Sequence, residues 1–80
     1  MSVNTEFYPI VAEVVAELAE IPVEQISAEK SLRDELALDS LTLVELWDVL
    51  AERLGMRFPD DDVAAIVSVG EIVTYAHAHR

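Results

Sequence analysis

The chain has 80 residues, which suits one domain over residues 1–80, and 52% of them are hydrophobic, enough for a folded globule. Sixteen acidic residues against five basic ones give a net charge of −11, which opposes binding to nucleic acids and to anionic membranes. The chain has no cysteine, so disulfides, thiolate metal sites and cysteine nucleophiles are excluded.

The start of the chain lacks the basic region and the apolar run of a signal peptide. No apolar stretch approaches the roughly 18 residues of a membrane-spanning helix. We therefore expect a cytoplasmic protein with no membrane span. A monomer is also expected. With only two glycines and three prolines to form turns, the sequence favours helices over a sheet.

The first helix is predicted from Tyr8 to Ala19, because apolar residues recur there at helical spacing. These residues are Phe7, Val11, Val14 and Leu18. Thr5 is the expected N-cap, and Pro9 is tolerated only near the first turn. Glu13 and Glu17 are expected on the exposed side.

A long loop is predicted from Ile21 to Ala37, because Pro22 bars continuation of the first helix. Scattered apolar residues are expected to anchor this loop to the core: Ile21, Val23, Ile26, Leu32 and Leu36. Ser31, Arg33 and Asp34 indicate a short helical turn within it.

The second helix is predicted from Ser40 to Leu54, with Asp39 as N-cap and Gly55 as C-cap. One face carries a core stripe of Leu43, Leu46, Trp47, Leu50 and Leu54. The other face, which we call the acidic docking face, combines two aliphatic side chains with three acids: Leu41, Val44, Glu45, Asp48 and Glu52. Aliphatic residues framed by acids are typical of a surface for basic partner proteins.

A short third helix is predicted from Asp60 to about Val67, and a fourth from Ser68 towards the C-terminus. Ser68 and Glu71 form an S-x-x-E capping box. The three consecutive acids Asp60, Asp61 and Asp62 are interpreted as N-capping the third helix, since they lack the spacing of a calcium-binding loop. The predicted fold is all-α: a small four-helix bundle of three main helices and a short third helix, with a long loop between the first and second.

The stretch from Leu36 to Leu41, followed by Val44-Glu45-Leu46, resembles the signature of acyl carrier proteins. The segments Phe58-Pro59-Asp60 and Ser68-Val69-Gly70-Glu71-Ile72 are also similar to that family, so the resemblance extends roughly from Phe7 to Ala78. It implies that Ser40 accepts 4′-phosphopantetheine from coenzyme A through a phosphopantetheinyl transferase. Asp39 would assist attachment, because the acid at this position in the family helps to hold the Mg²⁺ of the transferase.

The resemblance also implies partners. Acyl-transferring enzymes, ketosynthases or ligases with basic patches would dock on Leu41, Val44, Glu45 and Glu52, and Asp48 lies on the same face. Asp48 stands where many relatives have an apolar residue, which affects partner choice. Ala37 replaces a usual glycine, and a positive φ at this position would strain alanine.

The implied function is a carrier that is itself no enzyme and that holds acyl groups as thioesters in fatty-acid or polyketide-type biosynthesis. Candidate residues for lining a pocket for the acyl chain are Leu46, Leu50, Phe58 and Ile66, which equally suit the core. No catalytic constellation is evident, and His77 and His79 cannot share a helix face as a metal site would require, so no metal is expected.

Two other functions remain open at this stage. One is an aminoacyl or peptidyl carrier of nonribosomal peptide or siderophore synthesis. The other is an acidic helical adaptor without a cofactor, in which Ser40 is simply a residue of the first helical turn. Modification at Ser40 separates the adaptor from both carriers.

Overall fold

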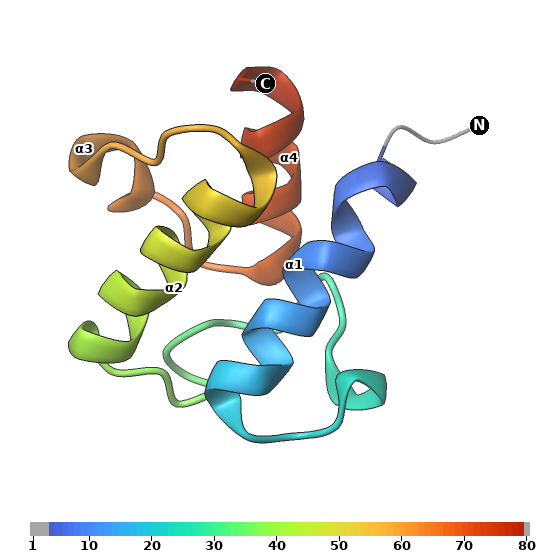
Figure 1. The fold of residues 1–80 in the computed structure, drawn as a ribbon. Helices are drawn as coiled ribbons and strands as arrows, with labels where there is room; N and C mark the ends of the chain where they lie inside the picture. The colour runs from blue at the N-terminus through green and yellow to red at the C-terminus, as the bar shows by residue number, and fades with distance from the viewer. Residues whose placement is uncertain (1–3, 80) are drawn as a thin grey trace.

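Helices make up most of the described chain. The computed structural model describes residues 4–79, with side chains from residue 7 onwards. Within this range the elements are α1 (Asn4–Ala19), the 3₁₀-helix η1 (Val23–Gln25), α2 (Ser40–Leu54), α3 (Asp60–Val63) and α4 (Val69–His79). The predicted all-α bundle, with a short third helix and a long loop before the second, is confirmed (Figure 1).

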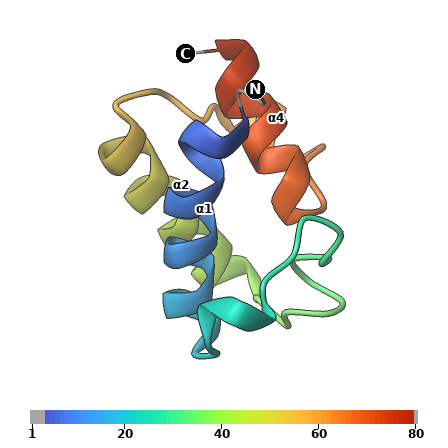
Figure 2. The ribbon, with the colours of Figure 1, turned by 90° about the vertical axis from the view of Figure 1, so that its right-hand side faces the viewer.

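Helix α1 is the central element of the bundle, because it packs against both α2 and α4. The two views show α2 and α4 on different sides of α1, with the long loop wrapping the end at which α1 finishes (Figures 1 and 2). In the described range, no helix combines the length and apolar character needed to cross a membrane.

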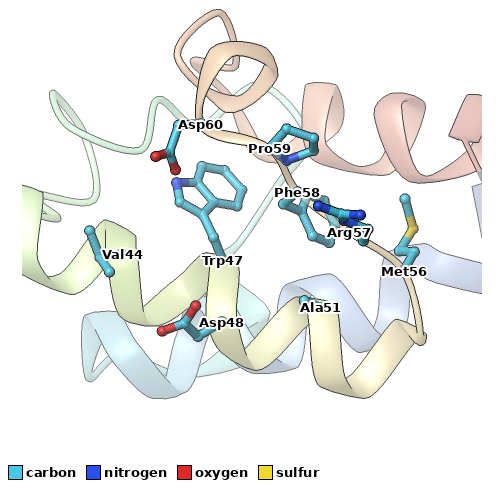
Figure 3. Close-up of a pocket in the computed structure, with 9 residues that line it drawn as sticks. All are labelled: Val44, Trp47, Asp48, Ala51, Met56, Arg57, Phe58, Pro59 and Asp60. Carbon is cyan, nitrogen blue, oxygen red and sulfur yellow. The ribbon is translucent and has the colours of Figure 1, made fainter.

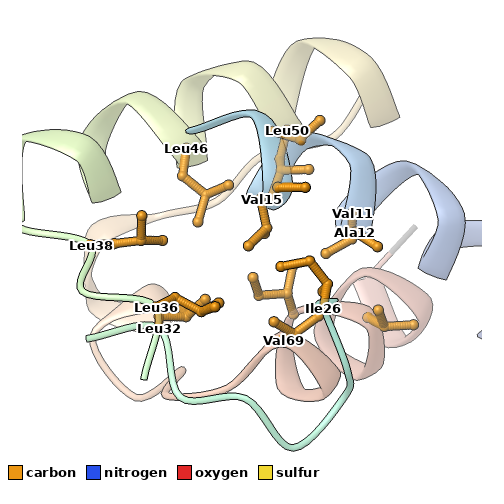
Figure 4. Packing of buried hydrophobic residues seen from close by; sticks show 14 residues of the cluster. Val11, Ala12, Val15, Ile26, Leu32, Leu36, Leu38, Leu46, Leu50 and Val69 are labelled. Atoms are coloured by element: carbon orange, nitrogen blue, oxygen red, sulfur yellow. The ribbon is translucent and has the colours of Figure 1, made fainter. Parts of the chain in front are cut away.

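The core lies where α1, α2, α4 and the long loop converge (Figure 4). Its fully buried large side chains come from all four segments and are Val11, Val14, Val15, Leu32, Leu46, Leu50, Val69, Ile72 and Val73. The stripe predicted on α2 is confirmed: Leu46 and Leu50 have no exposed surface, and Leu43, Trp47 and Leu54 pack partly buried against the cluster. Burial of apolar surface is the main stabilising contribution in a domain of this size.

Helix α1 begins four residues earlier than predicted, at Asn4 instead of Tyr8. Thr5 therefore lies inside the helix, so its prediction as N-cap is wrong, and its side chain is outside those described. Pro9 lies in the second turn, where it removes the one backbone bond that would run to residue 5. The helix continues through this position, with Phe7, Tyr8 and Val11 packed in or against the core.

The long loop is anchored by Ile26, Leu32 and Leu36, which are buried, and by the partly buried Ile21. The prediction for Val23 is wrong, because this side chain is 46% exposed. Val23 begins η1, a single turn that the sequence analysis missed and that contributes no buried residue.

Backbone hydrogen bonds tie the long loop to the start of α4. The amide of Leu32 donates to the carbonyl of Val67 (2.9 Å), and the amide of Gly70 donates to the carbonyl of Ala28 (2.9 Å). Between them, Ser31 and Ser68 form an isolated antiparallel bridge. The capping box is confirmed, since the Ser68 hydroxyl accepts from the Glu71 amide (3.3 Å) and the Glu71 carboxylate accepts from the Ser68 amide (3.2 Å).

Helix α3 ends at Val63, not at Val67 as predicted, and the chain continues in tight turns towards α4. The prediction that the three acids N-cap this helix is also wrong. Pro59 is the N-cap residue and makes no side-chain cap bond, while Asp60–Asp62 form the first turn. The Asp62 carboxylate instead accepts a 2.5 Å hydrogen bond from the Tyr75 hydroxyl of α4, which raises the pKa of Tyr75.

Candidate functional site

Ser40 is the first residue of α2, and its side chain is exposed. Asp39 precedes it with extended backbone and caps the helix, because its carboxylate accepts a hydrogen bond from the Thr42 amide (2.9 Å). Both positions follow directly from the sequence, since an acid before an amphipathic stripe is a favoured N-cap. The helix ends as predicted at Leu54, with Gly55 in the left-handed conformation (φ 66°).

The turn leading into Ser40 is fixed by Leu36 and Leu38, whose side chains are both buried. Between them, Ala37 has φ 58°, so the position where the family usually has glycine does require the left-handed region. The Leu38 amide donates to the carbonyl of Leu32 (2.9 Å), which ties this turn back to the anchored loop. Leu38 is a core residue that the sequence analysis did not identify.

Ala37→Gly is expected to stabilise the fold by up to about 1 kcal/mol. Left-handed backbone costs a non-glycine residue roughly 1–2 kcal/mol, which the entropy of glycine in the unfolded chain partly offsets. Urea unfolding measures the difference. The matched control is Ala51→Gly within α2, where the same change should destabilise by roughly 0.5–1 kcal/mol. Equal destabilisation by both variants would contradict strain at Ala37.

Asp39 is held in its charged form. The backbone amide and the hydroxyl of Thr42 lower the pKa of Asp39, and the amide of Leu41 and the Arg33 guanidinium add to the effect. A carboxyl whose pKa is lowered in the folded state stabilises the protein at pH values above its pKa in the unfolded chain, which is about 3.9. This stabilisation is lost as the pH falls through the pKa of the folded state.

The stabilising effect of Asp39 should therefore depend on pH. The difference in Tm between the wild type and Asp39→Ala is expected to be largest at neutral pH and to shrink below about pH 4. Asp39→Asn is the control, because an amide oxygen still accepts from Thr42 but does not titrate. Its advantage over Asp39→Ala should remain constant with pH. If the Tm difference between the wild type and Asp39→Ala stayed constant from neutral to acid pH, the charged carboxylate of Asp39 would not be what stabilises the helix start.

Among residues 4–79, Arg33 is the basic residue that hydrogen-bonds to Ser40. Its Nη2 atom donates a 3.2 Å hydrogen bond to the Ser40 Oγ, across seven positions of sequence. The contact depends on how the turn around Ala37 folds back, so spacing in the sequence could not reveal it. The only available signal was a cation close to Ser40 in a strongly acidic chain.

A hollow of about 260 Å³ opens beside Ser40, between α2 and α3. Most of its lining is apolar, and the full set is Arg33, Ser40, Leu43, Val44, Trp47, Asp60, Val63, Ala64 and Ile66. A second hollow of about 290 Å³ shares Val44, Trp47 and Asp60 with the first. It extends along α2 to Ala51 and reaches Phe58 in the segment between α2 and α3. In Figure 3, Trp47 projects from α2 towards the segment that carries Pro59 and Asp60.

The four residues predicted to line an acyl pocket fall into two groups. Ile66 lines the hollow beside Ser40, and Phe58 lines the second hollow, where it stacks on Trp47 with ring centroids 5.8 Å apart. Leu46 and Leu50 line neither of these hollows, because they point from α2 into the core beside α1 (Figure 4). An acyl chain would reach them only if core packing opened.

The acidic docking face of α2 is solvent-exposed along its length. Leu41 is 76% exposed and Val44 is 60% exposed, and Glu45, Asp48 and Glu52 are exposed beside them. Leu41 follows Ser40 directly, so the two aliphatic side chains lie at the same end of the helix as the serine hydroxyl. The structure thus brings together an accessible hydroxyl, an apolar hollow and an acidic surface.

Comparison with known proteins agrees with this arrangement. The family model described as "Phosphopantetheine attachment site" matches residues 9–76. The chain is 42% identical over 64 residues to an acyl carrier protein of Acidothermus cellulolyticus, covering 80% of this chain and 76% of that protein. It is 38% identical over 65 residues to a meromycolate extension acyl carrier protein of Mycobacterium leprae, and the match covers 81% of this chain but 56% of that longer protein.

Comparison of the fold with solved structures also finds an acyl carrier protein. A solution structure described as an acyl carrier protein from Anaplasma phagocytophilum superposes with a TM-score of 0.86 at 28% identity. The superposition covers 98% of this chain and 92% of that one, so the whole helical arrangement is shared. On the family match, the sequence identity and the fold together, this chain belongs to the acyl carrier protein family.

Proposed function

We propose that Ser40 is the attachment site for 4′-phosphopantetheine and that the chain carries acyl groups on this arm between enzymes of fatty-acid or polyketide-type biosynthesis, in the cytoplasm. The observation that carries the proposal is the position of Ser40: an exposed hydroxyl at the first residue of α2, beside a hollow of about 260 Å³. A transferase can reach this oxygen, and no buried group has to move.

The residues at the start of α2 suit the attachment of 4′-phosphopantetheine. In the attachment step, the Ser40 Oγ forms a bond to the phosphorus of coenzyme A that bears the pantetheine, the bond to adenosine 3′,5′-bisphosphate breaks, and the hydroxyl proton passes to a base of the transferase. Asp39 would assist: it stays charged near neutral pH, and its lowered pKa keeps it available to a Mg²⁺ ion brought by the transferase. When bound, the arm supplies the thiol that forms thioesters, and the chain has no cysteine to compete with it.

The lining of the hollow favours an alkyl cargo over an aminoacyl one. Six of its nine residues are apolar, which suits the burial of an alkyl chain. This supports an acyl carrier over the aminoacyl alternative. The Mycobacterium leprae relative, which is named for meromycolate extension, supports a role in building long hydrocarbon chains.

Partner enzymes would dock on the acidic docking face. Exposed Leu41 and Val44 provide apolar contact next to the arm, and Glu45, Asp48 and Glu52 provide charge for basic patches. A net charge of −11 would steer such partners from a distance, more strongly at low salt. The carrier would act as a monomer and as the substrate, not the catalyst, of each of these enzymes.

The test is intact-protein mass spectrometry after incubation with coenzyme A, Mg²⁺ and a promiscuous phosphopantetheinyl transferase. The wild type should gain one phosphopantetheine, and Ser40→Ala should gain none. Ser27→Ala, a serine change in the long loop, should be loaded like the wild type. A folded wild type that stays unmodified while a known carrier is loaded in parallel would refute the proposal and favour an adaptor without cofactor.

A further inference from the structure

Arg33 has an unusual position for a cation in this chain. It is one of five basic residues among sixteen acidic ones, and its guanidinium lies against the Ser40 Oγ at 3.2 Å. Arg53, by comparison, pairs with Glu13 at 2.9 Å, whereas Arg33 makes no ion pair within the described residues. A hydroxyl is a weak acceptor for a guanidinium, so the charge of Arg33 is not neutralised by this contact.

Two carboxylates close to Arg33 in the sequence accept hydrogen bonds from backbone amides. Glu35 accepts a 2.8 Å hydrogen bond from the Ser31 amide, and Asp39 accepts from the Thr42 amide. Asp60 faces the same hollow from the start of α3 without a hydrogen bond to Arg33. Arg33 thus has free donors directed towards the oxygen at which the arm would begin, in the wall of the hollow that the arm would enter.

We propose that Arg33 binds the phosphodiester at the base of the arm and so positions the arm at the mouth of the hollow. The proposal rests on attachment at Ser40. Attachment would convert the Ser40 Oγ into an ester oxygen of a phosphodiester and place on the phosphorus bonded to it two non-bridging oxygens that share one negative charge. A guanidinium already in contact with Oγ reaches these oxygens with little movement. Its planar donors match phosphate geometry, and the charged hydrogen bonds are about twice as strong as neutral ones.

The consequence is a restrained arm. Loading adds negative charge to a chain that already carries −11, and the acids of the docking face would repel a free phosphodiester. Arg33 offsets this repulsion at the attachment oxygen itself. It holds the root of the arm at the mouth of the hollow that Trp47 and Ile66 line.

The experiment compares loaded wild type, Arg33→Gln, Arg33→Lys and Arg53→Gln by NMR, after mass spectrometry has established loading of each. Arg53→Gln removes the same charge from the other end of α2, thirteen residues or about 20 Å along the helix. Loading should shift the Arg33 side-chain Nε–Hε resonance of the wild type and slow exchange of its proton. In Arg33→Gln the ³¹P signal should shift and sharpen as the root of the arm moves freely.

Salt distinguishes ion pairing from a general structural effect. Raising the salt to roughly 1 M, where the screening length is about 3 Å, should move the wild-type ³¹P signal towards that of Arg33→Gln and leave the Arg33→Gln signal unchanged. The ³¹P signal of Arg33→Lys should lie between those of the wild type and Arg33→Gln, and the ³¹P signal of Arg53→Gln should match that of the wild type.

Two results would overturn the proposal, and they have different meanings. An Arg33 resonance that does not respond to loading, with identical ³¹P signals in wild type and Arg33→Gln, would refute the role of Arg33 and leave attachment at Ser40 standing. Failure of the folded wild type to gain mass would refute attachment and this inference together. Because Arg33 is exposed, its substitution should leave the helical circular dichroism unchanged.

Discussion

Leu46→Ala should destabilise the fold by about 2–5 kcal/mol, because it removes a fully buried side chain and leaves a cavity between α2 and α1. A domain of 80 residues has a total stability on the order of 4–12 kcal/mol, so a large part of it would be lost. Urea unfolding at neutral pH measures the change.

The control for this prediction lies on the same helix. Leu41→Ala makes the same chemical change at a side chain that is 76% exposed, and its effect should stay within about 0.5 kcal/mol. Similar losses from the two variants would mean that α2 does not bury the face described here.

Leu32→Ala should also destabilise by about 2–5 kcal/mol, although it lies in the long loop and not in a helix. Its side chain is 2% exposed, and its backbone bonds to Val67 and Leu38 connect the start of α4 with the turn before Ser40. Hydrogen exchange at the Leu38 amide should accelerate more than the global loss of stability accounts for, because the loop would loosen first.

Val23→Ala is the corresponding control in the loop. Val23 is 46% exposed, so the substitution should change the free energy of unfolding by no more than about 0.5 kcal/mol. If Leu32→Ala were equally mild, the loop would be a linker that packs weakly, and the geometry of the turn before Ser40 would need another explanation.

The parts of the fold that the sequence predicted well are those set by local signals. Helix α2 begins and ends as expected because Asp39 and Gly55 are strong caps on either side of one continuous apolar stripe. The start of α4 was predicted for the same reason, through the reciprocal bonds of Ser68 and Glu71.

The errors arose where tertiary contacts outweigh local preference. Pro9 was expected near the first turn of α1, yet the helix starts five residues before it, and Phe7 and Tyr8 pack against the core. The acids of α3 were expected to cap the helix, but Asp62 instead bonds to Tyr75 of α4, a partner thirteen positions away. No local pattern reports such a pairing.

In the candidate site, too, some residues could be predicted from local signals and others depend on tertiary contacts. Ser40 and Asp39 could be placed from the sequence, because their roles follow from the start of a helix. Arg33 could not, because its contact with Ser40 requires both the left-handed backbone of Ala37 and the loop held against α4. The placement of Leu46 and Leu50 outside the hollows likewise depends on how α2 is rotated against α1.

Trp47 is the only tryptophan of the chain, and it lines both the hollow beside Ser40 and the second hollow, while stacking on Phe58. Indole fluorescence responds to the polarity of its surroundings. The protein therefore carries its own optical reporter at the place where a hydrocarbon chain would enter. Water displaced from this ring by an alkyl group would shift the emission to shorter wavelength, so cargo could be followed in real time in the wild-type chain, with no label attached.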